Sequence, residues 1–314
     1  DPEMSRGLGD VYKRQEYMQK KSAINKFCMR VLFKLSKWIP DKWYISIQNR
    51  LILGKAIDWH HPQLFSDKIQ YLKLYNRIPL YTTLVDKVAV KAYVADLIGK
   101  QYVIPTLGVY TKAEDIDWGA LPEQFVLKCN HDGGSNSVVL CKNKAKMDRV
   151  SVSKKLNNRL NINNYWHTKE WPYKHVVPCI LAEEMLQTFS GTIPEDYKFY
   201  CFNGVPKLVL VIIGRGVNLQ YCYFDMNFNF VPLMDKGMEI PEVKPAKPKN
   251  FEKMVELVKR LCIGMPYVRL DLYNIEGRIY FSEYTFYSAG GFECFEPYQW
   301  NLTLGEWINI TGVR

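Results

Sequence analysis

The earliest clear pattern in the chain is a series of apolar positions at helical spacing. Between Ser22 and Leu53, apolar residues recur about every 3.6 positions, and Pro40 followed by Asp41 interrupts the run. Lysines and arginines flank this stripe. We interpret the segment as a basic helical region packed on the main domain, and contact with an anionic membrane surface is the alternative. The stripe consists of Ile24, Phe27, Val31, Leu32, Leu35 and Trp38.

Further segments have the pattern of amphipathic helices. The first runs from Phe65 to Tyr75, and Ser66 and Asp67 are residue types suited to capping its start. The next runs from Asp86 to Ile98 and stops at Gly99, since glycine commonly ends a helix. Helical stretches are also predicted near 151–160 and 251–262.

Alternating or apolar runs predict a set of short strands. Few helices separate them, and hairpin-length turns join several, so the pattern favours an α+β architecture with antiparallel sheets. The clearest loops are 214–218 and 241–249. The predicted strands are Tyr102–Ile104, Phe125–Cys129, Val138–Cys141, Cys179–Leu186, Tyr197–Phe202, Lys207–Ile213, Leu219–Phe224, Tyr267–Tyr273 and Arg278–Phe286.

Charge and composition indicate which classes of binding partner to expect. The 314 residues are 47% apolar and 24% charged, which suits an ordinary globular core. The formal charge of +10 favours an anionic partner such as a nucleotide or an acidic glycan. We expect no nucleic-acid partner, because the chain has no zinc finger, recognition-helix pattern or aromatic RNA-binding signature.

The cysteines and the ends of the chain bear on location. None of the eight cysteines forms a CxxC pair, so neither zinc nor a redox pair is indicated and a reducing cytoplasm fits best. No signal peptide and no apolar run of about 18 residues is present. We expect a cytoplasmic protein that at most touches the inner face of the membrane. Residues 1–15 resemble adaptor-derived sequence, and we expect the chain to begin and end inside its natural gene.

The segment FVLKCNHDGGSNSVVL, from Phe125 to Leu140, reads as a strand, a glycine-containing loop and a second strand. Gly133 and Gly134 allow backbone N–H groups to approach an anion, and Ser135 adds a hydroxyl donor. Lys128 places a positive charge beside the loop. This combination suits a phosphate, but it is not a Walker loop, and a plain turn is the alternative.

The segment VRLDLYNIEGRIYFSEYTF, from 268 to 286, reads as a hairpin. A three-residue loop of Ile275, Glu276 and Gly277 would pair Asn274 with Arg278. That register predicts Arg269 opposite Glu283, Asp271 opposite Phe281 and Tyr267 opposite Thr285, with the charged side chains on one face. Two carboxylates on one sheet face suit Mg²⁺, which takes oxygen ligands and substrate phosphates. A loop of even length would place Asp271 and Glu283 on opposite faces.

The order of these features resembles the ATP-grasp superfamily. The 125–140 hairpin is similar to its phosphate-covering flap, and 269–291 is similar to its metal-binding hairpin. The stretches DKVAVKAYV, IPTLGVY, LKCNHDGGS and DYKFYCFNG most resemble the teichuronopeptide-synthesis (TupA-like) group, from about 62 to 296. The resemblance implies an ATP-grasp fold, in which two α+β lobes with antiparallel sheets enclose the nucleotide behind a helical N-terminal region.

The resemblance also implies roles for individual residues. Lys87, Lys128 and Lys198 would contact the nucleotide phosphates, with Gly133, Gly134 and Ser135 covering them. Either Glu183 or Glu184 would reach adenine or ribose, next to Met185 and Leu186. Asp271 and Glu283 would hold Mg²⁺, while Arg269 and Lys128 would assist the transfer. A departure is Thr285, where the family typically has asparagine, which puts a second metal site in doubt.

The implied organisation divides the chain into five parts. Residues 1–15 are the non-native tail, 16–76 the basic helical region and 77–120 the first part of the ATP-grasp region. Residues 121–186 form the flap lobe and 187–314 the metal-binding lobe.

The implied reaction is ATP-dependent ligation of a carboxylate to an amine through an acyl phosphate. The resemblance suggests a uronic-acid carboxylate of an acidic surface polysaccharide and an amino acid as substrates. One alternative is a glycosyltransferase that binds a nucleotide sugar at Asp115 and Asp117, which form a DxD triplet. Another is a non-catalytic relic that retains at most nucleotide binding.

Overall fold

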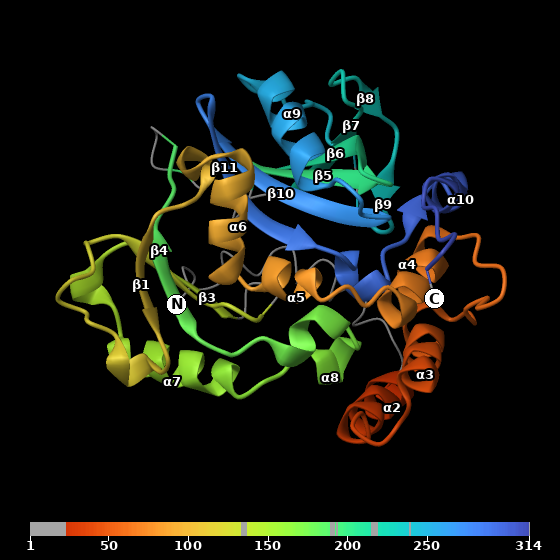
Figure 1. Cartoon of the computed structure of the whole chain (residues 1–314), viewed down its shortest axis with the longest axis horizontal. Coiled ribbons are helices and arrows are strands. Elements are labelled where there is room, and N and C mark those ends of the chain that lie inside the picture. The colour runs from red at the N-terminus through yellow and green to blue at the C-terminus, as the bar shows by residue number, and fades with distance from the viewer. Residues whose placement is uncertain are drawn as a thin grey trace.

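A computed structural model shows two antiparallel sheets with helices packed around them (Figure 1). A third, two-stranded sheet pairs β9 (Met234–Asp235) with β12 (Phe295–Glu296). The residues that the structure describes are 23–132, 137–188, 192, 194–214, 219–238 and 240–313.

The larger sheet has six strands in the order β11-β10-β5-β6-β7-β8. One face packs on α9 (Phe251–Leu261), whose Phe251, Met254 and Leu257 are fully buried. Because side chains alternate along a strand, the other face of β5, β10 and β11 presents charged groups. The strands are β5 (Asp196–Phe202), β6 (Val205–Ile213), β7 (Gln220–Phe224), β8 (Phe230–Val231), β10 (Tyr267–Ile275) and β11 (Arg278–Thr285).

The smaller sheet has four strands in the order β1-β4-β2-β3. Its apolar face packs on α7 (Arg149–Leu160) through Leu156, which is fully buried. The strands are β1 (Thr106–Tyr110), β2 (Phe125–Cys129), β3 (Val138–Cys141) and β4 (Ile180–Glu184). Each sheet therefore has an apolar cluster of its own, and the predicted α+β fold with antiparallel sheets is confirmed.

The predicted helices lie close to their expected positions. α4 spans Phe65–Tyr75, as expected, and α6 spans Ala89–Ile98 before Gly99, whose φ is 119°. The Asp86 carboxylate accepts hydrogen bonds from the Val88 and Ala89 N–H groups at the start of α6. Shorter helices are α5 (Leu80–Val85), α8 (Tyr165–Thr168) and α10 (Gln299–Glu306), with 3₁₀ turns at 113–115, 144–146, 171–175 and 288–291.

The predicted capping of α4 is wrong. The helix begins after Leu64, without a side-chain cap, and Ser66 and Asp67 lie inside its first turn. Both residues are buried and instead bind Lys55, whose Nζ lies 3.0 Å from each side chain. The two side chains that were predicted to cap the helix therefore form a tertiary contact with Lys55 instead.

The basic N-terminal region forms two helices that project from the body of the protein (Figure 1). α2 spans Ala23–Lys34 and α3 spans Asp41–Leu53, so the predicted interruption near Pro40 is confirmed. Tyr44 and Gln48 of α3 each donate a hydrogen bond to the His167 carbonyl at 3.0 Å. The packing interpretation of the α2 stripe is largely wrong, because Leu32 is the only one of its six apolar residues that is buried.

One predicted strand is also wrong. Lys100–Tyr102 is a 3₁₀ turn, and the strand of this region is β1, which begins after Pro105. β1 lies at the edge of the smaller sheet, and none of its five residues is buried. An edge strand with little burial lacks the apolar alternation on which a sequence-based prediction relies.

Candidate active site

The hairpin of β10 and β11 differs from the predicted one at two points. Its turn has two residues, Glu276 and Gly277 with φ of 52° and 93°, so the predicted three-residue loop is wrong. A register shift then places one extra residue, Ser282, in β11. Beyond this bulge Asp271 is opposite Glu283 and Arg269 is opposite Thr285, which corrects the predicted partners. The bulge restores Asp271 and Glu283 to one face despite the even loop.

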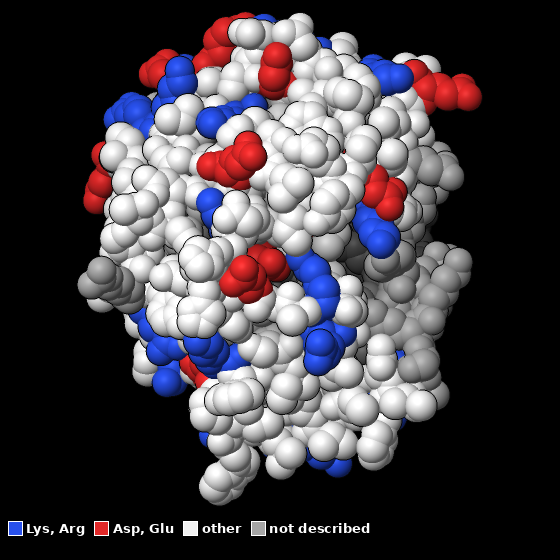
Figure 2. Space-filling view, turned by 90° about the vertical axis from the view of Figure 1, so that its right-hand side faces the viewer, with Lys and Arg blue, Asp and Glu red and all other residues white. Residues whose placement is uncertain are grey.

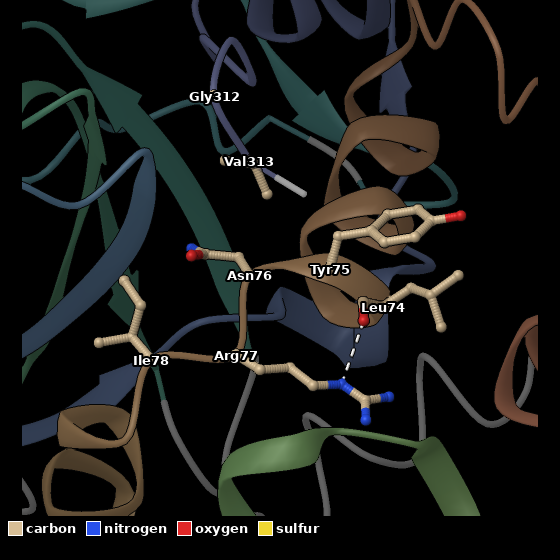
Figure 3. Close-up of a pocket in the computed structure, with 7 residues that line it drawn as sticks. All are labelled: Leu74, Tyr75, Asn76, Arg77, Ile78, Gly312 and Val313. Atoms are coloured by element: carbon tan, nitrogen blue, oxygen red, sulfur yellow. Dashed lines mark hydrogen bonds between the residues drawn. The ribbon is translucent and has the colours of Figure 1, made fainter.

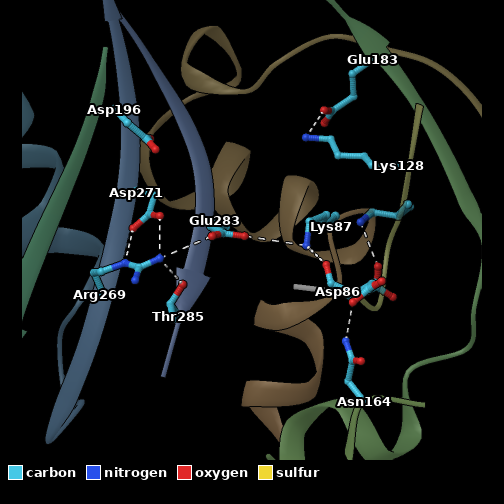
Figure 4. Close-up of polar contacts among 12 residues, drawn as sticks. Asp86, Lys87, Lys128, Asn164, Glu183, Asp196, Arg269, Asp271, Glu283 and Thr285 are labelled. Carbon is cyan, nitrogen blue, oxygen red and sulfur yellow. Dashed lines mark hydrogen bonds and ion pairs between the residues drawn. The ribbon is translucent and has the colours of Figure 1, made fainter. Parts of the chain in front are cut away.

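Asp271 lies at the centre of the charged sheet face and is 1% exposed. Arg269 donates to its two carboxylate oxygens from Nε at 2.7 Å and from Nη2 at 2.8 Å. Lys198 of the neighbouring β5 also pairs with Asp271, and its Nζ lies 3.1 Å from Asp196. The Thr285 hydroxyl accepts a hydrogen bond from Arg269 at 3.1 Å (Figure 4). A buried carboxylate is thus compensated by two cations.

Glu283 is the more open carboxylate, with its side chain 31% exposed. Its Oε1 lies 3.6 Å from Arg269 Nη2, and its Oε2 lies 3.7 Å from Lys87 Nζ. Burial raises the pKa of this carboxyl, but Lys87, Lys198 and Arg269 outweigh that effect and bring the pKa below its usual value. Glu283 therefore carries its negative charge at neutral pH.

The donor set of Asp271 and Glu283 fits Mg²⁺. The two carboxylates are directly opposite each other on adjacent strands, where Cβ atoms are about 5 Å apart. Among the described residues no cluster of three or more His, Cys, Asp or Glu side chains suits a metal. Mg²⁺ does not need one, because it typically binds one or two carboxylates and completes its shell with water and substrate phosphates.

The smaller sheet contributes a second charged cluster, around Glu183 of β4. Lys128 of β2 pairs with one oxygen of Glu183, and Lys91 of α6 lies 2.6 Å from the other. Burial alone would raise the pKa of Glu183, whose side chain is 5% exposed, but the two lysines lower it below its usual value. Lys91 was not predicted. Its signal was its position four residues after Lys87 in the helix predicted from Asp86 to Ile98, since residues at that spacing share a helix face.

Lys87 lies between the two clusters (Figure 4). Its Nζ donates to the Asp132 carbonyl at 2.7 Å and lies 3.7 Å from Glu283, and its N–H donates to the Asn130 carbonyl at 3.1 Å. The Asp132 side chain is buried against Arg159 and Asn164, whose amide donates to it at 2.6 Å. One ammonium group therefore contacts both the loop after β2 and the Glu283 carboxylate of the larger sheet.

The family model for TupA-like ATP-grasp proteins matches residues 67–309 of this chain. The chain belongs to the TupA-like ATP-grasp family. The match includes both sheets and every described residue of the two charged clusters. A search of curated proteins found no match.

The solved structures that resemble this chain include two D-alanine–D-alanine ligases and a ribonucleotide synthetase. D-alanine–D-alanine ligase from Helicobacter pylori is 15% identical, with a TM-score of 0.44 over 78% of this chain and 67% of that one. The ligase from Bacillus anthracis is 16% identical, with a TM-score of 0.42 over 72% and 67%. An ADP complex of purK, N5-carboxyaminoimidazole ribonucleotide synthetase, is 14% identical with a TM-score of 0.41. It is matched over 66% of this chain and 46% of its own. The family assignment rests on the family model and not on these similarities.

The structure of this TupA-like protein describes only some of the other residues that the sequence predicts to contact the nucleotide. Gly133, Gly134 and Ser135 lie outside the described residues. Glu184, the last residue of β4, is exposed, and Met185 and Leu186 after it are half-buried. Their contacts with adenine and ribose stay predictions.

One open pocket, of about 590 Å³, lies away from the charged clusters. It is at the end of α4 against the C-terminal segment (Figure 3). None of its lining residues belongs to the predicted site, so the charged clusters and not this pocket define the candidate active site. The lining residues are Leu74, Tyr75, Asn76, Arg77, Ile78, Gly312 and Val313.

The loop after β11 is held by buried polar side chains of α4. Lys73 is fully buried and donates to the Gly290 carbonyl, and Gln70 donates to the Gly291 carbonyl at 3.1 Å. Gly290 and Gly291 have φ of 65° and 81°, which glycine adopts without strain. The segment that follows the predicted metal ligands is therefore fixed to the N-terminal region.

Burial lowers the pKa of Lys73 to about 8, although nearby Glu170 acts to raise it. Between that value and 10.5 the unfolded chain binds the proton and the folded chain does not, so folding becomes more favourable as pH rises. We therefore compare the free energies of unfolding of the wild type and of Lys73→Met. The wild-type value minus the variant value should increase from about pH 8 to about pH 10, by at most about 1.4 kcal/mol per pH unit. Urea titrations at both pH values measure it.

The exposed Lys259 of α9 provides the matched control for Lys73. The corresponding difference for Lys259→Met should not change with pH, since this side chain lies in water in the folded chain as it does in the unfolded chain. A Lys73→Met difference that stayed constant or fell with pH would show that Lys73 remains charged in the folded protein.

Proposed function

We propose that this protein is an ATP-dependent carboxylate–amine ligase that acts through an acyl phosphate on an acidic surface polysaccharide or its precursor. The observation that carries the proposal is the position of Lys87. It contacts the Asp132 carbonyl beside the predicted flap and lies 3.7 Å from Glu283. This position supports a site in which residues proposed to bind the phosphates lie next to a residue proposed to hold Mg²⁺.

The proposed roles follow from charge and position. Lys87 and Lys128 face the transferred phosphoryl group as fixed positive charges, and Arg269 adds a third from the larger sheet. Asp271 and Glu283, with the Thr285 hydroxyl, would hold Mg²⁺, which neutralises charge on the β- and γ-phosphates when bound. Lys198, which pairs with Asp271, fixes the orientation of that carboxylate.

The proposed chemistry needs no nucleophile from the protein. A carboxylate oxygen of the substrate attacks the γ-phosphorus, the bond to the β,γ-bridging oxygen breaks, and ADP leaves. An amine then attacks the acyl carbon, the C–O bond to phosphate breaks, and an amide and inorganic phosphate form with loss of one proton. The lysines and Arg269 stabilise the charge that develops on the phosphoryl oxygens.

The remaining proposed contacts concern the nucleotide and the acceptor. Either Glu183 or Glu184, with Met185 and Leu186, would bind adenine and ribose, and the 133–135 loop would cover the phosphates. Glu183 already pairs with two lysines, whereas Glu184 is exposed. Glu184 is therefore the better candidate for the contact with adenine or ribose. A net charge of +10 supports an acidic glycan as the carboxylate donor, and an amino acid is the proposed amine. A cytoplasmic location follows from the need for ATP.

The proposal is tested by trapping the acyl phosphate. We expect the purified protein, incubated with ATP, Mg²⁺, hydroxylamine and a panel of uronic acids and short acidic glycans, to release ADP and form a hydroxamate with at least one acid. Hydroxylamine replaces the unknown amine, so only the carboxylate has to be found. Lys128→Ala should lower both products together, because the lysine acts before the branch between amine and hydroxylamine.

Other outcomes would favour the alternatives. ATP binding without ADP release would indicate the non-catalytic relic. Thermal stabilisation by a nucleotide sugar but not by ATP would favour the glycosyltransferase. The fold offers that alternative little support: Asp117 accepts hydrogen bonds from the Gly119 and Ala120 N–H groups in a turn, and Asp115 accepts one from Thr111 at 2.6 Å.

A further inference from the structure

The outer side of α2 carries an apolar stripe that contacts no core. Ile24, Phe27 and Trp38 are 71%, 65% and 84% exposed, and Val31 and Leu35 between them are exposed as well. The helix is attached through other residues. Leu32 and Ser36 are buried, and the Phe33 ring stacks on His167 with centroids 3.6 Å apart.

The neighbouring helix exposes large apolar side chains as well. Trp43 of α3 is 68% exposed and Ile47 is 42% exposed, and these residues are one helical turn apart. We give the name N-terminal apolar surface to seven exposed apolar residues of the two helices and of the turn between them. They are Ile24, Phe27, Val31, Leu35, Trp38, Trp43 and Ile47. Soluble proteins rarely leave so many large apolar side chains together without a partner.

A row of basic residues accompanies the N-terminal apolar surface. All are exposed, and in the described part of the chain no ion pair engages them. No acidic residue occurs between 23 and 40, so the field of α2 is uniformly positive. In Figure 2 the lower part of the molecule is mainly white and blue, and acidic side chains lie mostly higher up. The basic residues are Lys26, Arg30, Lys34, Lys37, Lys42 and Arg50.

We propose that the N-terminal apolar surface docks on an anionic lipid bilayer. A helix with an apolar face beside a lysine- and arginine-rich face lies in the interfacial plane, with its apolar side chains at the boundary of headgroups and acyl chains. Trp38 and Trp43 are suited to that boundary, where tryptophan is enriched. The cations of α2 itself, Lys26, Arg30 and Lys34, then face the anionic headgroups. Among the described residues, no helix is long and apolar enough to cross a membrane.

The charge argues for lipid over other occupants. A second copy of this chain would bring two positive helices together, which costs free energy instead of stabilising the contact. Nucleic acid would match the charge, but phosphate contacts make no use of five exposed aliphatic or phenylalanine side chains and two tryptophans. Anionic lipid satisfies both the apolar and the charged half of the surface.

Vesicle sedimentation tests the proposal. We expect the full chain to sediment with vesicles of equal parts phosphatidylcholine and phosphatidylglycerol and to stay in solution with phosphatidylcholine alone. The double variants Phe27→Glu/Trp38→Glu and Lys26→Gln/Arg30→Gln should each lower the partition coefficient by about tenfold or more. Added salt should weaken binding of the wild type more than that of Lys26→Gln/Arg30→Gln, because the basic variant has less charge to screen.

The matched control is Val150→Glu/Val243→Glu, which changes two residues that are each 81% exposed elsewhere on the protein. It should bind like the wild type. Equal binding by all variants, or no binding to anionic vesicles, would overturn the proposal. Sedimentation equilibrium that shows self-association abolished by Phe27→Glu/Trp38→Glu, without vesicle binding, would assign the surface to a second copy. Hydroxamate formation without vesicles should be the same in all variants, so this test is independent of the proposed reaction.

Discussion

Glu283→Gln should lower ADP release by about 100- to 1,000-fold while leaving the fold intact. The reason is that Glu283 is proposed to hold Mg²⁺ and lies on the open side of the hairpin, with its side chain 31% exposed. An amide keeps the size of the side chain and loses the negative charge that a hard cation requires. Initial rates of ADP release at saturating ATP, measured across a Mg²⁺ titration, provide the readout.

Glu276→Gln is the matched control for Glu283. Glu276 is in the turn of the same hairpin, is exposed and pairs with Lys249 at 3.3 Å. Its replacement should leave the rate within about twofold, since exposed ion pairs contribute little. Retention of normal turnover and Mg²⁺ dependence by Glu283→Gln would remove the metal site from the β10–β11 hairpin.

Asp271→Asn should lower the free energy of unfolding by about 3 kcal/mol. The side chain is 1% exposed and compensates both Arg269 and Lys198, so an amide leaves two cations with less negative charge in a buried place. This loss of stability is near the lower end of the range for breaking a buried ion pair, because each cation keeps another carboxylate nearby. Glu283 lies 3.6 Å from Arg269, and Asp196 lies 3.1 Å from Lys198. Urea unfolding at neutral pH without nucleotide measures it.

Two variants show whether the loss at Asp271 comes from stranded charge. Asp117→Asn, at an exposed turn where an amide oxygen can still accept the two N–H groups, should change stability by less than about 0.5 kcal/mol. Lys198→Met combined with Asp271→Asn should recover part of the loss, since the unpaired ammonium is gone. An Asp271→Asn protein as stable as the wild type would mean that Arg269 and Lys198 do not depend on this carboxylate.

The sequence determined those features that depend on neighbours along the chain. The period of apolar residues located α4 at 65–75 and placed α6 before Gly99, because burial of one helix face imposes that period. Strand alternation placed Arg269 and Asp271 on one face of β10, and the order of motifs indicated the ATP-grasp family, to which the chain belongs.

Tertiary structure decided the features in which distant segments compete for the same groups. The facing of Asp271 and Glu283 depends on a bulge at Ser282, and a bulge adds one residue without a mark in the apolar pattern. The pairing of Lys91 with Glu183 joins residues that are far apart in the chain. The α2 stripe has the same spacing whether it is buried or exposed. Spacing determines which side chains share a face, and only the packing of the whole chain decides what that face contacts.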